Sequence, residues 1–228
     1  MTNKNNYDQF GSDYFENRVG NDKLRQLSFD LERQYIEKMI GVENLQAANI
    51  LDVGCSTGEF YEAMKWGYQN KYGMEISEFA RSMAESKGIK FDKDISNDNF
   101  FDLIIFRGTI QYLKNPFEYI ESAYRSLKKG GKIIFLATPN ANSIYFRKFK
   151  TLPFLEESLN YYIPTDISLS MNLKNVGFEI RDLRYPYLLS PYSRPIMDHI
   201  KFIYKLIFNG NVKFPFWRNM IWLTAIKK

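Results

Sequence analysis

The stretch that decides the fold is ILDVGCSTGEF, residues 50–60. Its first four residues are apolar apart from Asp52, which is typical of a short buried strand. The small residues from Gly54 to Gly58 predict a tight turn, and a helix is expected from Glu59 onward. A strand, a tight turn and a helix in succession begin a parallel α/β sheet, whose ligands bind outside the carboxyl ends of the strands. We therefore expect a ligand site at this turn.

Strands and helices alternate on both sides of the turn. An amphipathic helix is predicted over residues 22–39, with Phe29 lying off its apolar stripe. That stripe consists of Leu24, Leu27, Leu31, Tyr35 and Met39. Further strands are predicted at residues 71–75, 89–91, 101–106, 132–137, 177–183 and 219–226, and further helices at 59–66, between 77 and 88, and at 116–127, 166–175 and 196–208. This alternation predicts the α/β class, with a doubly wound, mostly parallel sheet, helices on both faces and right-handed crossovers.

The composition favours one globular domain. The chain has 228 residues, of which 45% are hydrophobic, so it can bury a sizeable core. It contains no internal repeat or composition-shifting linker, and we expect a single domain over residues 1–228. An N-terminal lid and helix (1–45) would precede a cofactor-binding core (46–140) and two substrate-side insertions (141–165 and 185–217). The motif DYFE at residues 13–16 is either a lid over the cofactor or a tail with a docked aromatic side chain.

Charge and cysteine content restrict the class of protein. The net charge of +5 is spread along the chain, which weakens a nucleic-acid-binding interpretation without excluding it. The single cysteine, Cys55, cannot form an intrachain disulfide. The first twenty residues are polar, and no apolar run approaches the roughly 18 residues of a membrane span. We expect a soluble, cytoplasmic protein.

The turn from Gly54 to Gly58 is suited to an anion, because small residues allow close backbone approach and the next helix offers free N–H groups. A phosphate loop would need Gly-Lys-Ser/Thr, and a dinucleotide loop would need glycines where Ser56 and Glu59 stand. A carboxylate is the natural anion that remains. Glu75, at the end of the next strand, can accept hydrogen bonds from ribose hydroxyls, although it could be a solvated charge.

Residues 94 and 95 are candidates for a purine site. Asp94 could bind an exocyclic amine while Ile95 covers the ring, although aspartate is also common in ordinary turns.

Four segments in this order and spacing resemble the successive motifs of class I S-adenosylmethionine-dependent methyltransferases. They are ILDVGCSTGEF (50–60), GMEIS (73–77), FDLIIFRGTIQYLKNP (101–116) and LKKGGKIIFLATPN (127–140). The resemblance covers residues 49–140 strongly and the rest of the chain more loosely. It implies S-adenosyl-L-methionine as cofactor and a Rossmann-like sheet of seven strands whose last strand is antiparallel.

The resemblance also implies roles for matching residues. Asp52, Gly54 and Gly58 would surround the methionine part, Glu75 would bind the ribose, and Arg107 would line the methyl-donor cleft. The full set that it implies for cofactor binding is Asp52, Gly54, Cys55, Ser56, Gly58, Glu75, Ile76, Asp94, Ile95 and Arg107. Ser56 departs from the usual glycine but is small enough for binding to survive.

A second departure concerns the chemistry. Similar proteins often carry Glu-His before Pro116, whereas this chain has Gln111-Tyr112. The candidates for a general base are Tyr112, His199 and Asp198, although His199 also fits an ordinary position on a helix face. Asp166 is interpreted as a helix N-terminal residue rather than a base. No cluster with metal-ligand spacing stands out, so no metal is predicted.

The acceptor is expected to be a small molecule. The aromatic insertion 185–217 suits stacking on sugar rings, which favours O-methylation of a sugar or glycan-related metabolite. A nucleic-acid methyltransferase and a non-catalytic, cofactor-binding partner subunit remain the alternatives. The basic, aromatic segment 201–208 could contact a membrane surface peripherally, although a buried helix is also consistent with it. The protein would be a monomer or a homodimer.

Overall fold

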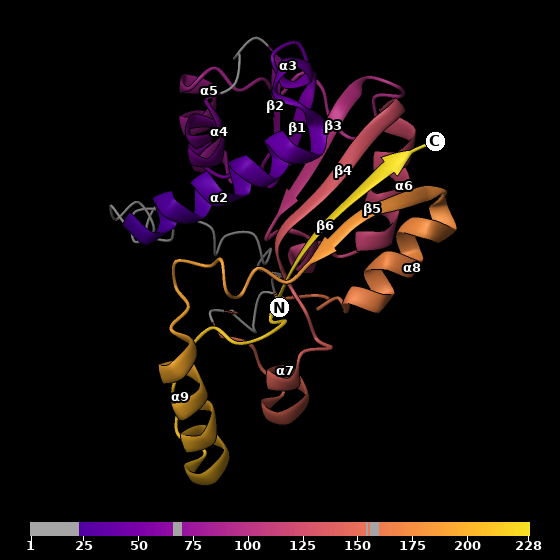
Figure 1. Ribbon diagram of the computed structural model, residues 1–228. Helices are drawn as coiled ribbons and strands as arrows, with labels where there is room; N and C mark the ends of the chain where they lie inside the picture. Colours follow the sequence, from indigo (N-terminus) through magenta and orange to yellow (C-terminus); the bar gives the residue numbers. More distant parts are fainter. Residues whose placement is uncertain (1–22, 66–69, 154, 156–159) are drawn as a thin grey trace, which may run out of the picture.

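The computed structural model describes residues 23–65, 70–153, 155 and 160–228 (Figure 1). Six strands form one sheet in the order β2-β1-β3-β4-β6-β5. Their bounds are β1 (Ile50–Val53), β2 (Lys71–Met74), β3 (Phe101–Arg107), β4 (Leu127–Pro139), β5 (Phe178–Arg184) and β6 (Met220–Lys227). Strands β1 to β4 pair in parallel, and β6 is antiparallel to both of its neighbours, β4 and β5. The predicted α/β class and the antiparallel last strand are confirmed.

The prediction of seven strands is wrong for the described residues. The expected strand at residues 89–91 makes a single parallel bridge, between Lys90 and Tyr72 of β2. Lys90 N–H donates to the Lys71 carbonyl and the Lys90 carbonyl accepts from Gly73 N–H, both at 2.9 Å. The segment then leaves the sheet edge, and Phe91 lines a cleft instead of continuing the ladder. Pairing therefore stops after one residue.

Helices cover both faces of the sheet (Figure 1). Side chains of β3 alternate between the two cores: Leu103 and Ile105 face one, Ile104 and Phe106 the other, as the two-residue repeat of a strand requires. The first face is covered by α2 (Lys23–Ile40), α3 (Val42–Leu45), α4 (Glu59–Met64) and α5 (Glu78–Ser86). The second is covered by α6 (Pro116–Ser126) and α8 (Asp166–Val176). Both layers leave the carboxyl ends of the parallel strands accessible.

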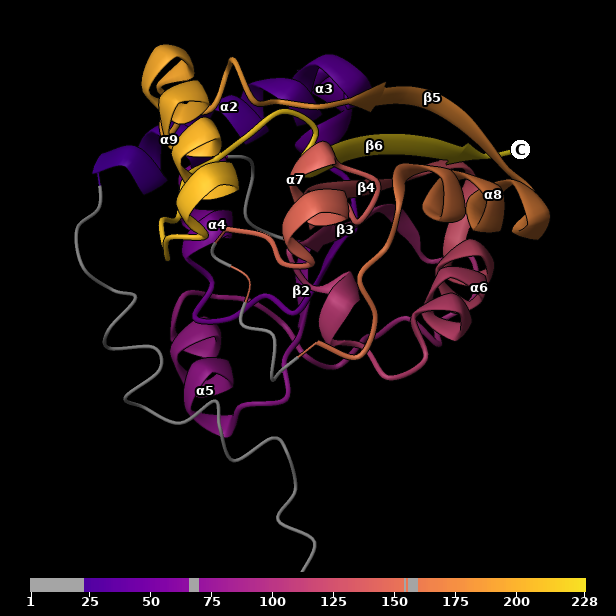
Figure 2. The same cartoon turned by 90° about the horizontal axis from the view of Figure 1, so that it is seen from below.

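The two predicted insertions extend beyond this carboxyl edge. The first contains α7 (Ile144–Phe149) and the second contains α9 (Pro195–Phe208). Figure 2 shows the two helices next to each other when the edge is viewed from below. A separate small core joins them, centred on Tyr145, Phe214 and Phe216. The proposed lid at residues 13–16 lies outside the described residues, and no described helix combines the length and the apolarity needed to cross a bilayer.

The buried face of α2 differs from the predicted stripe. Phe29 is fully buried, whereas Leu27 of the stripe is 43% exposed. Phe29 packs edge-on against Phe60 of α4, with ring centroids 5.6 Å apart. The helix is turned because its next buried position, Glu32, pairs with Arg107 at the end of β3. A stripe of aliphatic residues alone could not reveal this ion pair.

This orientation of α2 predicts a large loss of stability for one substitution and a small change for its neighbour. Phe29→Ala should lower the free energy of unfolding by about 3–5 kcal/mol, because it removes a fully buried ring. Leu27→Ala should change it by less than about 0.5 kcal/mol, because the side chain is largely solvated. Urea denaturation of both variants measures the difference. Equal losses, or a larger loss for Leu27→Ala, would contradict the observed face.

Candidate functional site

A cleft of about 660 Å³ lies at the carboxyl ends of β1, β2 and β3. Its volume falls within the roughly 300–1,000 Å³ of small-molecule sites. The predicted residues that line it are Asp52, Gly54, Cys55, Ser56, Glu75, Ile76, Asp94, Arg107 and Tyr112. Gly58 begins α4 directly behind the turn. The structure therefore brings nearly all of the predicted cofactor-binding residues to one cavity.

The turn after β1 and the acid after β2 are joined directly. Ser56 N–H donates to Glu75 Oε2 at 3.0 Å. The other carboxylate oxygen, Oε1, accepts from the N–H groups of Ile76 and Ser77, both at 2.9 Å. Glu75 thus fixes the turn against the end of β2 and still borders the cleft. The turn after β1 and Glu75, which the sequence resemblance assigns to cofactor binding, therefore lie side by side.

The backbone of this turn explains its small residues. Gly54 has a φ of 78°, and a Cβ there would lie 2.6 Å from Thr109 Cγ2, so only glycine fits without displacement. Ser56 also has a left-handed conformation, with a φ of 53°. This conformation is easiest for glycine and is strained for serine. The departure at position 56 is therefore tolerated sterically, at some cost in backbone strain.

Asp52 is the least satisfied polar group in the cleft. It is 2% exposed, and its Oδ1 atom has no hydrogen-bond partner among the described residues. Burial raises the pKa of Asp52 to about 7; Arg107 opposes this effect and Glu75 adds to it. A buried acceptor without a donor is costly unless a ligand completes it. An ammonium group, such as the one on the amino-acid part of S-adenosylmethionine, fits this requirement.

Arg107 is held by a residue that the sequence interpretation missed. Its Nε donates to Glu32 Oε2 at 2.6 Å, and Glu32 is almost completely buried. Burial raises the pKa of Glu32, and the Arg107 charge partly offsets that rise. The guanidinium also lies 4.5 Å from the centre of the Phe29 ring. One feature of the sequence could have identified Glu32: it stands three residues after Phe29, on the helix face that continues with Tyr35 and Ile36.

The two residues of the predicted purine site are separated. Asp94 borders the cleft, and its Oδ1 accepts from Ser96 N–H at 2.8 Å. Ile95 is buried in the core on the α6 side, and its carbonyl accepts from the Ser126 hydroxyl. Ile95 is not among the residues that line the cleft, whereas Ile76 and Phe91 are. These two apolar side chains are the ones available to cover a purine ring.

The three candidate bases also separate. Tyr112 lies in the short 3₁₀ helix η3 (Ile110–Tyr112) and borders the cleft, near Tyr119 and Tyr161. His199 and Asp198 lie on α9 and do not line the cleft. His199 Nδ1 is 2.6 Å from the Pro195 carbonyl oxygen. Of the three candidates, the structure brings only Tyr112 to the cofactor cleft.

Asp198 belongs to the beginning of α9. Its Oδ2 accepts from the Tyr187 hydroxyl at 2.9 Å and from Arg194 N–H at 2.8 Å. These bonds fix the helix start and leave the carboxylate turned away from the cleft.

The first insertion reaches the cleft through Tyr161. Its N–H donates to the Gln111 carbonyl at 2.9 Å, which holds the segment before α8 against η3. In the parts of the chain that the structure covers, no three His, Cys, Asp or Glu side chains are grouped as metal ligands would be.

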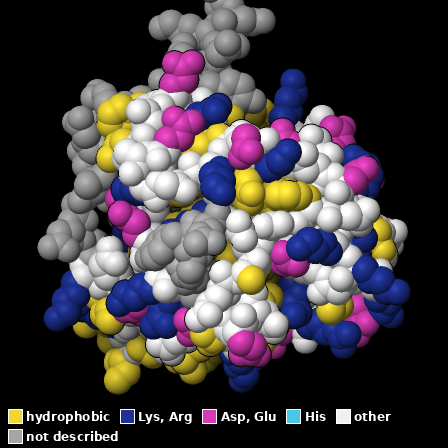
Figure 3. Space-filling view, turned by 90° about the horizontal axis from the view of Figure 1, so that it is seen from above, with side chains coloured by type: hydrophobic (Ala, Val, Ile, Leu, Met, Phe, Trp, Pro, Cys, Tyr) yellow, Lys and Arg dark blue, Asp and Glu magenta, His cyan; other side chains and the backbone are white. Residues whose placement is uncertain are grey.

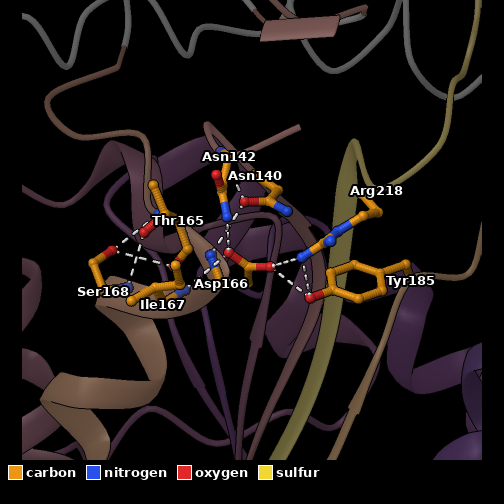
Figure 4. A network of polar contacts seen from close by, with 8 residues as sticks. All are labelled: Asn140, Asn142, Thr165, Asp166, Ile167, Ser168, Tyr185 and Arg218. Carbon is orange, nitrogen blue, oxygen red and sulfur yellow. Dashed lines mark hydrogen bonds and ion pairs between the residues drawn. The ribbon is translucent and has the colours of Figure 1, made fainter. Parts of the chain in front are cut away.

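A polar network around Asp166 ties both insertions to the sheet (Figure 4). Asp166 Oδ1 accepts from Asn142 Nδ2 at 2.9 Å, and Oδ2 accepts from the Tyr185 hydroxyl and from Arg218 Nη2, each at 2.5 Å. Thr165 caps α8 immediately before it. Asp166 therefore has the structural role at a helix start that the sequence indicates, and it joins elements after β4, after β5 and before β6.

This network predicts a stability effect with a defined pH dependence. Burial opposes ionisation of Asp166, but hydrogen bonds from Tyr185, Asn142 and Arg218 outweigh it and lower its pKa. A lowered folded-state pKa stabilises the protein above the unfolded value of roughly 4, and this stabilisation is lost as pH falls through the folded pKa. Asp166→Ala should cost about 1–3 kcal/mol near neutral pH. Urea denaturation should show a smaller difference from wild type in acid, and exposed Glu121→Ala serves as the control.

The raised pKa of Asp52 predicts how cofactor affinity depends on pH. A carboxyl with a pKa of about 7 is mostly neutral one unit below that value, so S-adenosylhomocysteine should bind about ten-fold more weakly near pH 6 than at its plateau near pH 8. Asp52→Asn should remove this dependence and bind weakly throughout. Calorimetric titration across this range measures both proteins. A flat wild-type profile would show that the ionised carboxylate is not what the ligand requires.

Comparisons with known proteins agree with this geometry. A family model described as "Methyltransferase domain" matches residues 24–183. An uncharacterised protein of Methanocaldococcus jannaschii is 28% identical over 135 residues, 57% of this chain and 60% of the relative. A malonyl-[acyl-carrier protein] O-methyltransferase of Calditerrivibrio nitroreducens is 26% identical over 138 residues, 59% of this chain and 54% of the relative. The chain thus spans only about half of the length of the curated relatives it matches.

The fold is shared with proteins of solved structure. A Thermotoga maritima structure described as an S-adenosylmethionine-dependent methyltransferase, possibly a histamine N-methyltransferase, aligns with a TM-score of 0.63. The alignment covers 97% of this chain and 98% of that one at 19% identity, which shows a common fold. The family match covers most of the chain, and the cleft of this fold contains the predicted cofactor residues. The chain belongs to the methyltransferase-domain family, and its cofactor is S-adenosylmethionine.

Proposed function

We propose that the protein transfers the methyl group of S-adenosylmethionine to a hydroxyl oxygen of a small acceptor, a sugar or glycan-related metabolite. The observation that supports this most is the cleft itself. It combines a buried, unsatisfied Asp52, a glycine-bounded turn bonded to Glu75, and three tyrosines among its lining residues. The cofactor supplies a methyl group on a positively charged sulfur, which is displaced in line by the acceptor.

The residues of this chain position the two reactants. Asp52 would bind the ammonium group, Glu75 the ribose hydroxyls, and Ile76 and Phe91 the purine faces. Orientation at near-contact distance supplies a large share of the acceleration in such displacements. Arg107 is fixed by Glu32 and cannot easily rotate into the acceptor space.

The acceptor side favours a polyhydroxylated molecule. Tyr112, Tyr119 and Tyr161 line the cleft, and tyrosine offers both a ring face for stacking and a hydroxyl for hydrogen bonding. The Calditerrivibrio relative is named as an O-methyltransferase, which supports oxygen over nitrogen as the acceptor atom. A cytoplasmic location fits the proposal.

Nucleic acid is a poorer fit. The cleft contains five carboxylates, Asp52, Glu59, Glu75, Asp94 and Glu118, against four cations, Arg25, Arg81, Arg107 and Lys114. A polyanion requires a clear excess of cations along its path. Filter binding that weakens steeply with salt would nevertheless restore this alternative.

A non-catalytic partner subunit is the other alternative, and Gln111-Tyr112 in place of Glu-His is the feature that favours it. It predicts cofactor binding with no turnover on any acceptor of a broad panel of amines, sugars and carboxylates.

Calorimetry with S-adenosylhomocysteine tests the cofactor role of Glu75. Glu75→Gln should weaken binding about 10- to 100-fold, because hydrogen bonds to a charged acceptor are lost. Glu121→Gln, an exposed acid on α6, should leave affinity unchanged. Thermal denaturation checks that the Glu75→Gln turn remains folded. Binding by Glu75→Gln equal to wild type would reject this residue as the ribose ligand.

Tyr112 is the proposed general base. If it accepts the hydroxyl proton, Tyr112→Phe should lower kcat about 100- to 10,000-fold on the acceptor found in the panel, with S-adenosylhomocysteine affinity unchanged. Tyr119→Phe removes a hydroxyl from another tyrosine that lines the cleft and is the matched control. A change in KM alone would assign Tyr112 to acceptor binding.

A further inference from the structure

Helix α9 presents its apolar side chains outward. Ile196 is 82% exposed, Ile207 67% and Phe208 65%. The two buried residues of the helix are instead charged, Asp198 and Lys205. An ordinary surface helix has the reverse arrangement, with apolar residues toward the core. The exposed apolar residues of α9 are Ile196, Met197, Ile200, Ile203, Tyr204, Leu206, Ile207 and Phe208.

Specific contacts hold the helix in this orientation. Asp198 accepts from Tyr187 and Arg194, as described above, and Lys205 Nζ donates to the Gly210 carbonyl at 3.1 Å. Between them Phe202 stacks on Phe216 with ring centroids 4.4 Å apart. Rotating α9 to bury its isoleucines would break all of these contacts. The outward apolar face is therefore built into the packing.

This apolar face lies at one end of the molecule. Figure 1 shows α9 extending away from the sheet beyond its carboxyl edge. Leu188 and Leu189, just before the helix, and Ile144 of α7 are also exposed. None of these residues lines the cofactor cleft. Contiguous apolar surface of this kind marks a contact site for a partner or a lipid surface.

Among the described residues, the exposed charges around this face have one sign. In the described parts of the two insertions, every exposed Asp, Glu, Lys or Arg side chain is a cation: Arg147, Lys148, Lys150, Arg194 and Lys213. The acid within those parts, Asp198, is buried. At the opposite end of the molecule, which Figure 3 shows from above, Lys and Arg alternate with Asp and Glu. In the described residues, the end that contains α9 is therefore complementary to an anionic surface.

We propose that α9 docks on an anionic phospholipid bilayer, with its isoleucines and Phe208 in the interface and the cations on the head groups. An apolar helix face combined with surrounding basic residues is the pattern of interfacial membrane binding. A second copy of the chain is a poorer occupant, because a symmetric contact would bring two sets of five cations together. Docking of this kind would bring the protein to acceptors at a membrane surface.

Vesicle co-sedimentation of the full chain tests the proposal. The protein should bind vesicles of phosphatidylcholine with phosphatidylglycerol far more tightly than vesicles of phosphatidylcholine alone, and added salt should weaken binding. Ile207→Asp should reduce binding at least about ten-fold, since an apolar contact is replaced by a repelled charge. Ile167→Asp on α8, at an isoleucine of similar exposure, should bind as wild type does. Lys148→Ala should weaken binding about five-fold.

Results of two kinds would overturn the proposal. One is wild-type protein that ignores anionic vesicles, or Ile207→Asp that binds them as well as Ile167→Asp does. The other is a dimer in sedimentation equilibrium that Ile207→Asp dissociates, which would assign the face to a second copy. Affinity for S-adenosylhomocysteine should be the same in all variants, because α9 lies outside the cofactor cleft. Failure of membrane docking is thereby distinguishable from failure of cofactor binding.

Discussion

The hydrogen bond from Ser56 N–H to the Glu75 carboxylate is the contact on which the site depends. It connects the turn after β1 to the end of β2 and leaves an opening between them. Parallel pairing of β1 and β2 brings these chain ends to the same edge, and the left-handed backbone at Gly54 and Ser56 lets the turn approach the acid. Backbone bonds from Gly54 N–H and Cys55 N–H to the Met74 carbonyl, at 2.7 and 3.1 Å, hold the turn against the same strand end. Together these contacts make the turn and the acid two sides of one cleft.

The electrostatics of the cleft follow from burial. Asp52 and Glu32 are both removed from water, yet they differ in their partners. Glu32 has Arg107, whereas Asp52 Oδ1 has none among the described residues. An isolated buried carboxyl favours its neutral form, and an arriving cation favours the charged form. Binding of a positively charged ligand group beside Asp52 is therefore favourable. Arg107, already paired, contributes positive potential without competing for that position.

The sequence predicted the order of strands and helices well, because buried parallel strands such as residues 101–107 are apolar on both faces and the turns between elements carry glycine, proline or capping residues. The sequence-based predictions were wrong where contacts between distant segments determine the structure. The face of α2 depends on an ion pair with Arg107, 75 residues away in sequence, and no local pattern contains that information. The segment 89–91 has strand composition but only one bridging residue at the sheet edge. Strand propensity does not measure how long two segments stay adjacent.

The candidate site divides in the same way. Residues within the motifs, from Asp52 to Glu75, could be predicted because the fold requires strand ends to meet. Ile95, one residue from Asp94, lies in the core, where its carbonyl accepts from the Ser126 hydroxyl of α6, a tertiary contact that no local pattern contains. His199, the only histidine of the sequence, was a candidate base, but it lies on α9 and does not line the cleft. For α9 the sequence left an exposed apolar face and a buried helix as alternatives, since helical periodicity identifies a stripe but not which side of the helix meets the protein.

The central claim is that the opening between the Ser56 turn and Glu75 binds an adenosyl amino acid. A crystal structure of the protein grown with S-adenosylhomocysteine tests it most directly. We predict the ribose hydroxyls on Glu75, the ammonium group beside Asp52 Oδ1, and the sulfur facing the space bordered by Tyr112. A ligand bound elsewhere, or one that contacts neither Glu75 nor Asp52, would contradict it.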